Sequence, residues 1–81
     1  MTALHTEEYR AFAAALVAAR EKAGLSQYDL AERLSVDQSF ISKYENRRRR
    51  LDVVEFVRIM DAIGTDPSDL IGDVWAVLRR R

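Results

Sequence analysis

Helix-start signals recur along the chain, and they limit its possible folds more than any other feature of the sequence. At each of them a Ser, Thr or Asp side chain can accept a backbone N–H of the first helical turn, just before apolar residues that repeat every three or four positions. No segment alternates polar and apolar residues as a strand does, and only three glycines and one proline interrupt the chain. The sequence predicts a compact all-α protein with one domain over residues 1–81. Its expected helices are at about residues 7–22, 27–34, 38–46, 53–63 and 67–78.

The apolar positions of these segments define the expected core. Around the turn that joins residues 27–34 to 38–46, we expect five side chains to pack together: Leu30, Leu34, Val36, Ile41 and Phe56. The following segment has its own apolar pattern, in which the residues expected to face the core are Val53, Phe56, Val57, Met60 and Ile63. Gly24 and Gly64 follow helical patterns and are expected to end them.

Several classes of protein are excluded by what the sequence lacks. It has no cysteine, so it forms no disulfide and has no thiol nucleophile or Cys-based zinc site. Its one histidine, His5, lies in a polar N-terminal segment without carboxylates at ligand spacing. The longest apolar run, residues 11–19, is shorter than the roughly 20 residues of a membrane span, and no basic segment starts a signal peptide. We expect a cytoplasmic protein that is not an enzyme, with no cofactor and no metal.

The charge is distributed in blocks. The chain has 13 basic and 13 acidic residues, and the resulting zero net charge argues against a protein that grips a polyanion by bulk charge. However, residues 38–50 contain five basic and one acidic residue, whereas residues 51–78 contain one basic and six acidic residues. The basic block favours a helix that reads the major groove with phosphate contacts beside it. The alternative is that residues 47–50 and 79–81 are solvated arginine runs without a ligand.

The residues of this region resemble a known family. They are Gly24-Leu25-Ser26-Gln27, Leu30-Ala31, Val36, Gln38-Ser39, Ile41-Ser42 and Tyr44-Glu45. Over about residues 20–70 the chain is similar to the lambda-repressor-like, Cro-type helix-turn-helix regulators, also called the xenobiotic-response-element type. The resemblance implies a five-helix DNA-binding domain whose helix-turn-helix comprises residues 27–34 and 38–46. It also implies a sequence-specific transcriptional regulator, a repressor, with double-stranded operator DNA as its partner.

The resemblance also implies roles for individual residues. Base contacts are expected from Gln38, Ser39, Ser42 and Lys43, and phosphate contacts from Arg20, Gln27, Tyr44, Asn46, Arg47 and Arg48. Arg20 and Glu45 match positions that form a salt bridge. Gln27 has three possible roles, namely phosphate contact, brace for Gln38 and simple helix capping. Phe40 either packs inward or touches a thymine methyl group.

Two positions depart from the family pattern. The family usually has glycine in the turn between the two motif helices, where the backbone φ is positive, but this chain has Ser35. It also has Arg47 where the family often has a second glycine. The substitution at Ser35 indicates either a strained backbone or a slightly different turn.

The last segment carries more apolar residues than one buried stripe requires. A homodimer interface is expected at Leu70, Val74, Trp75 and Leu78. The alternative is that Trp75 fills the core of a monomer, and Gly72 could kink the helix. A dimer would bind a palindromic operator, as expected for a repressor or for a restriction-modification controller. Two further possibilities are an antitoxin with a toxin protein as partner and a helical protein-interaction module that binds no DNA.

Overall fold

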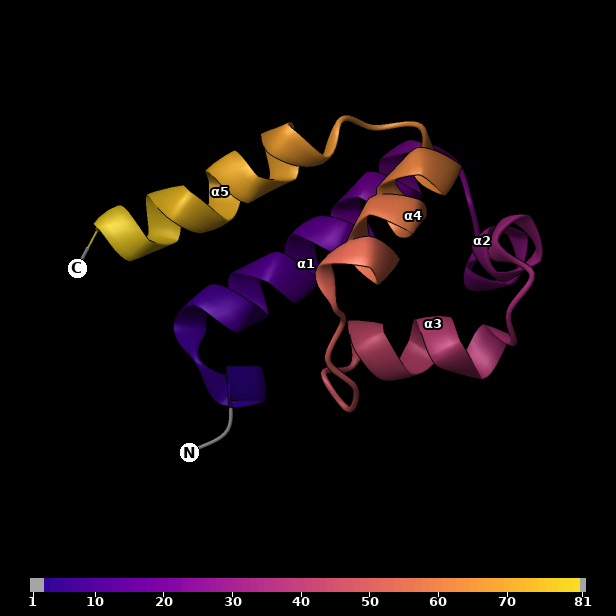
Figure 1. Cartoon of the computed structure of the whole chain (residues 1–81), viewed down its shortest axis with the longest axis horizontal. Coiled ribbons are helices and arrows are strands. Elements are labelled where there is room, and N and C mark those ends of the chain that lie inside the picture. Colours follow the sequence, from indigo (N-terminus) through magenta and orange to yellow (C-terminus); the bar gives the residue numbers. More distant parts are fainter. Residues whose placement is uncertain (1–2, 81) are drawn as a thin grey trace.

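The computed structural model describes residues 3–80, in which five α-helices follow a short 3-10 helix. The elements are η1 (Ala3–His5), α1 (Glu7–Lys22), α2 (Gln27–Leu34), α3 (Gln38–Glu45), α4 (Val53–Ile63) and α5 (Pro67–Arg79) (Figure 1). The all-α prediction is confirmed, and each predicted helix boundary lies within one residue of the observed one. Of the basic C-terminal residues, Arg81 lies outside the described part of the chain.

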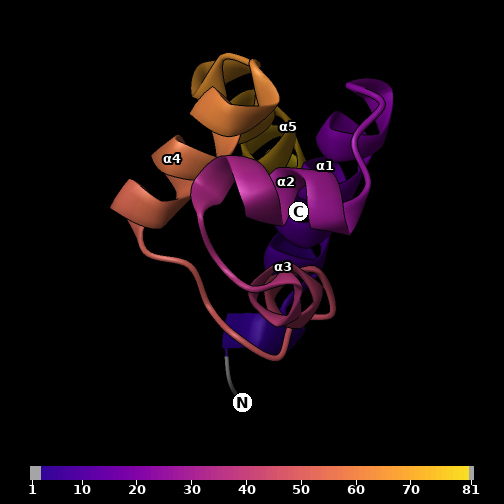
Figure 2. The same cartoon turned by 90° about the vertical axis from the view of Figure 1, so that its right-hand side faces the viewer.

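The helices are arranged around α1, the longest of them at 16 residues (Figure 1). Helix α5 packs along α1, and α2 packs against both α3 and α4. In Figure 2, α3 is seen end-on while α2 lies across it. Both views place α5 and α3 on opposite sides of the molecule. A surface formed by α3 is therefore separate from one formed by α5.

The predicted caps form at four of the five α-helix starts. The side chains of Thr6 and Asp66 each accept a backbone N–H of the first turn. Helices α2 and α4 begin with reciprocal capping boxes, formed by Ser26 with Asp29 and by Asp52 with Glu55. These hydrogen bonds hold the pKa of Asp29 and that of Asp66 below the usual range of a carboxyl group. Asp37 is the N-cap residue of α3, but its side chain makes no capping hydrogen bond.

The core lies between the helices and includes most of the predicted positions. Its buried residues are Leu16, Leu30, Ala31, Ile41, Tyr44, Phe56, Ile59, Met60, Ile63 and Leu70. Three predicted core residues are exposed: Val36, Val53 and Val57. The reason on α4 is geometric, because Val57 lies roughly 100° around the helix from Phe56, away from the buried side. Val53 occupies the first turn, where its side chain is 76% exposed, and Val36 lies in the connection before α3.

The residues of α5 divide between the core and the surface. Leu70, predicted at a dimer interface, is buried in the core of its own chain, and Val74 packs against that core. Trp75 is 60% exposed, which contradicts the alternative that it fills a monomer core. Ile71 and Leu78 are exposed as well, and the helix continues through Gly72 without interruption. Within residues 3–80, none of the helices has the length and hydrophobicity that crossing a bilayer requires.

Ser35 adopts the left-handed conformation, with φ 56° and ψ 44°, so of the two alternatives considered for this turn the structure supports the strained backbone. A residue with a Cβ is strained there by about 1–2 kcal/mol, and glycine avoids that strain at a smaller entropic cost. We expect Ser35→Gly to raise the free energy of unfolding by about 0.5–1 kcal/mol, or the melting temperature by roughly 2–8 °C. Thermal unfolding followed by circular dichroism measures this. Ser35→Ala, which keeps the Cβ, is the control without a gain, and an unchanged or lower melting temperature for Ser35→Gly contradicts the prediction.

Candidate nucleic-acid interface

The packing of α3 leaves one side of this helix at the surface. Ile41 and Tyr44 are buried and fasten its inner side to the core. The four predicted base-reading residues lie away from that inner side: Ser39 and Lys43 are exposed, and Gln38 and Ser42 are partly exposed. They carry amide, hydroxyl and ammonium groups, which can donate or accept hydrogen bonds at base edges. The outer side of α3 is thus polar and available to a ligand.

Phe40 belongs to the packed side rather than to the free one. Its ring makes an edge contact with Tyr44, with ring centroids 5.7 Å apart, and the guanidinium of Arg49 lies 4.7 Å from its centroid. It is partly buried against the core. Of the two roles considered for Phe40, the structure supports inward packing.

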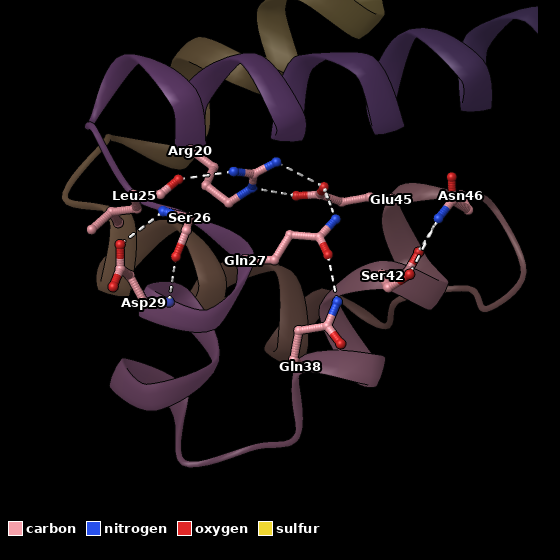
Figure 3. A network of polar contacts seen from close by, with 9 residues as sticks. All are labelled: Arg20, Leu25, Ser26, Gln27, Asp29, Gln38, Ser42, Glu45 and Asn46. Carbon is pink, nitrogen blue, oxygen red and sulfur yellow. Dashed lines mark hydrogen bonds and ion pairs between the residues drawn. The ribbon is translucent and has the colours of Figure 1, made fainter.

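The predicted salt bridge between Arg20 and Glu45 is confirmed (Figure 3). Arg20 Nε donates to Glu45 Oε2 at 2.8 Å and Nη2 donates to Oε1 at 3.0 Å, while Nη1 donates to the carbonyl of Leu25 at 2.8 Å. The hydrogen bond to Glu45 raises the pKa of Arg20 above its usual value. The two side chains are only 10% and 5% exposed. Arg20 therefore joins α1 to α3, and only a tenth of its side chain remains exposed for the predicted phosphate contact.

Gln27 connects this ion pair to the outer side of α3. Its Nε2 donates to Glu45 Oε1 at 2.9 Å, and its Oε1 accepts from Gln38 Nε2 at 2.6 Å (Figure 3). Among the roles considered for Gln27, bracing of Gln38 is thus confirmed. The bond between Gln27 and Glu45 was not predicted, because the two residues are 18 positions apart and only the packing of α2 on α3 brings them together.

Asn46 folds back on the end of α3. Its Nδ2 donates to the carbonyl of Ser42 at 2.9 Å and to the Ser42 hydroxyl at 3.3 Å (Figure 3). Asn46 remains exposed, so these bonds leave it at the surface beside the polar side of α3.

The four arginines after α3 have different environments. Arg49 donates to both carboxylate oxygens of Glu55, at 3.0 and 2.8 Å, and this pairing lowers the pKa of Glu55. Arg49 therefore ties the loop to α4, a role that the sequence did not reveal. Arg47 has a left-handed backbone with φ 58°, and its buried Nη1 has no hydrogen-bond partner among residues 3–80. Arg48 and Arg50 are exposed, and they are the arginines of this run most accessible to an anion.

Tyr44 was predicted to contact a phosphate, but the structure places it in the core. Its side chain is 1% exposed, and its buried hydroxyl has no hydrogen-bond partner within the described residues. Burial raises the pKa of this hydroxyl well above that of a free phenol, and the nearby Glu45 carboxylate raises it further. The hydroxyl therefore stays protonated and unable to carry charge. The expected phosphate contact came from the family resemblance alone.

Removal of this unpaired hydroxyl should stabilise the protein. A buried polar group without a partner costs about 1–3 kcal/mol, so we expect Tyr44→Phe to raise the free energy of unfolding by about 1 kcal/mol. Chemical denaturation measures this change. Tyr28→Phe, at an exposed tyrosine, is the matched control and should stay within about 0.5 kcal/mol of the original protein. A loss of stability in Tyr44→Phe is the result that contradicts this prediction.

The chain was compared with protein families, with known sequences and with solved structures, and each comparison found a related protein. The helix-turn-helix family profile matches residues 16–70, which is more than half of the chain. A protein described as control protein C.MunI, from Mycoplasma sp, is 31% identical over 55 residues, which are 68% of this chain and 74% of that protein. The solved structure of an XRE-family like protein from Pseudomonas syringae pv. tomato str. DC3000 matches with a TM-score of 0.84 and 46% identity. That match covers 90% of this chain and 89% of the other.

Proposed function

We propose, given that this chain belongs to the helix-turn-helix family of DNA-binding transcriptional regulators, that it is a sequence-specific repressor that binds a palindromic operator as a homodimer. The single observation that carries this proposal is the division of α3 into two sides. Ile41 and Tyr44 hold one side rigidly in the core, while the other presents hydrogen-bonding groups at the surface. A helix so held can enter a major groove as a unit.

The base contacts follow from the chemistry of the outer side of α3. The amide of Gln38 matches the N6 and N7 atoms of adenine, and the ammonium of Lys43 can donate to guanine O6 or N7. Ser39 and Ser42 can accept or donate and therefore tolerate several bases.

Phosphate contacts would come from the residues that flank α3. Asn46 and Arg48 are exposed after its C-terminal end, and Gln27 lies at the first turn of α2, where free backbone N–H groups favour an anion. Arg47 is half-buried in the same loop and adds a positive charge beside Arg48. Arg50 is exposed in the same loop and can add to this positive charge.

The proposed homodimer uses the exposed side of α5. Ile71, Trp75 and Leu78 are large apolar side chains on successive turns of this helix, and Val74 lies beside them. Burying them against a second copy would remove them from water. Since α5 and α3 form separate surfaces, such a dimer does not cover the α3 helix of either copy (Figures 1 and 2). A palindromic operator requires the dimer to hold its two α3 helices about one DNA turn apart, roughly 34–36 Å.

A more specific role is favoured by one relative. The similarity to a protein described as a control protein, C.MunI, supports regulation of a restriction-modification operon as the second candidate. This role involves the same dimer and the same type of operator, so it differs from a phage or chromosomal repressor only in the genes that are controlled.

Selection of bound sites from a random DNA library tests the proposed function. We expect the selected sites to contain an inverted repeat whose two halves are about one helical turn apart. We also expect the logarithm of the binding constant to fall linearly with the logarithm of the salt concentration. The slope reports the number of phosphate contacts. Absence of DNA binding at about 50 mM salt would overturn the proposal and favour a helical module that binds protein.

A further inference from the structure

We infer that Glu45, although it is almost fully buried, determines which base Gln38 prefers, because it fixes the direction of two side-chain amides. This inference rests on the proposed function, in which Gln38 contacts a base. The evidence is the continuous chain of hydrogen bonds that runs from Arg20 through Glu45 and Gln27 to Gln38 (Figure 3). Glu45 is thus a positioning residue that acts through Gln27.

The direction of this chain begins with the carboxylate. An ionised carboxylate accepts hydrogen bonds and donates none. Both oxygens of Glu45 accept from Arg20, and Oε1 also faces the amide of Gln27. Gln27 must therefore turn its NH2 group toward Glu45, and its own oxygen then faces the opposite way.

The same constraint passes to the next amide. Because the oxygen of Gln27 faces Gln38, Gln38 must offer its NH2 group, and this bond is short at 2.6 Å. The oxygen of Gln38 and its second N–H remain without a partner among residues 3–80. One free acceptor beside one free donor complements adenine, which offers the N6 amino group and the N7 acceptor. Guanine offers two acceptors at this edge and does not fit this orientation.

The variant Glu45→Gln should remove this constraint. Arg20 donates to two different oxygens of Glu45, so an amide with a single oxygen cannot accept both bonds. The introduced amide can turn either its oxygen or its NH2 group toward Gln27. When the NH2 group faces Gln27, Gln27 flips to accept it and donates to the oxygen of Gln38, which then presents its NH2 group outward. Two N–H donors complement the O6 and N7 acceptors of guanine.

The experiment measures base preference at every position of the selected operator. Dissociation constants are determined for operators with each base pair substituted in turn, for the original protein and for Glu45→Gln. We expect the ratio of adenine to guanine affinity to fall at least about tenfold at one position of each half-site and to change little elsewhere. Glu55→Gln makes the same chemical change in the ion pair with Arg49, outside the chain, and should leave every preference unaltered. Uniform weakening in Glu45→Gln, with preferences unchanged, would overturn the inference.

A second measurement needs no DNA. In the original protein the side-chain NH2 groups of Gln27 and Gln38 are both engaged, so hydrogen exchange at both should be slow by nuclear magnetic resonance. In Glu45→Gln, exchange should become fast at Gln38 and stay slow at Gln27. Equal exchange in the two proteins would refute the control of Gln38 by Glu45, whether or not the proposed operator binding is correct.

Circular dichroism is used to test whether the Glu45→Gln protein is folded. If it is not, Gln27→Met provides the same test, since it breaks the chain while the ion pair between Arg20 and Glu45 stays intact. Gln38 is then free to flip, and its preference for adenine over guanine should fall toward equality. A preference that persists in Gln27→Met would contradict the inference.

Discussion

Glu45→Ala is expected to lower the free energy of unfolding by about 3–5 kcal/mol, the cost of leaving one partner of a buried ion pair without the other. The guanidinium of Arg20 would keep its hydrogen bond to the carbonyl of Leu25 but would lose the bonds to both carboxylate oxygens. Its side chain is 10% exposed, so water cannot readily replace them. Denaturant titration measures the loss. In a domain of this size it is a large part of the total stability.

The matched control is Glu55→Ala. It breaks the ion pair of Glu55 with Arg49, whose side chains are 28% and 40% exposed and hence better solvated. The ion pair itself should contribute no more than about 1 kcal/mol there. The double variant Arg20→Met with Glu45→Ala removes both charges, and it should be less destabilised than Glu45→Ala alone. A loss in Glu45→Ala as small as that in Glu55→Ala would contradict the assignment of a buried structural pair.

Trp75→Glu is expected to dissociate the proposed homodimer and to weaken operator binding by about 10²–10⁴-fold. The carboxylate would stand in the middle of an apolar surface that two copies must desolvate. A monomer binds one half-site at a time, so it loses the additional affinity that a dimer obtains by binding both half-sites with its two α3 helices. Because Trp75 is 60% exposed within one chain, its replacement should leave the fold intact. Analytical ultracentrifugation reports the oligomeric state, and titration with operator DNA reports the affinity.

Val53→Glu is the control for this second prediction. It places the same charge on another exposed apolar residue, on α4 instead of α5, and should leave both the dimer and the affinity unchanged. If the original protein is itself a monomer at the concentrations at which it binds its operator, the dimer through α5 is wrong. The same conclusion would follow from a Trp75→Glu protein that remains dimeric.

Most of the fold could be predicted because its determinants are local. A capping side chain acts on N–H groups two or three residues away, and apolar spacing reports which side of a helix is buried. The start of α2 at Ser26 and that of α4 at Asp52 were therefore located correctly. At Ser35 the sequence left two alternatives open, a strained backbone and a different turn, and the structure shows the positive φ of the first.

The exposure of individual side chains could not be predicted in the same way. Val57 has the spacing of a core residue but lies outside the side of α4 that meets other helices. Tyr44 has a polar hydroxyl and borders an arginine run, yet its ring fills the core. Arg49 is one of four consecutive arginines, and only its distance to Glu55 distinguishes it from the others. In each case the decisive neighbour comes from another element.

The sequence by itself determined the five helices, the family resemblance and the candidate residues of the helix proposed to contact DNA, because each depends on residue type and short-range spacing. The tertiary structure decided which charges are available to a ligand. Arg20 and Glu45, 25 positions apart, neutralise each other in the interior, whereas Lys43 and Arg48 remain at the surface. The reason is that a hydrogen bond requires atoms about 3 Å apart. Only the packing of helices distant in sequence can set that distance.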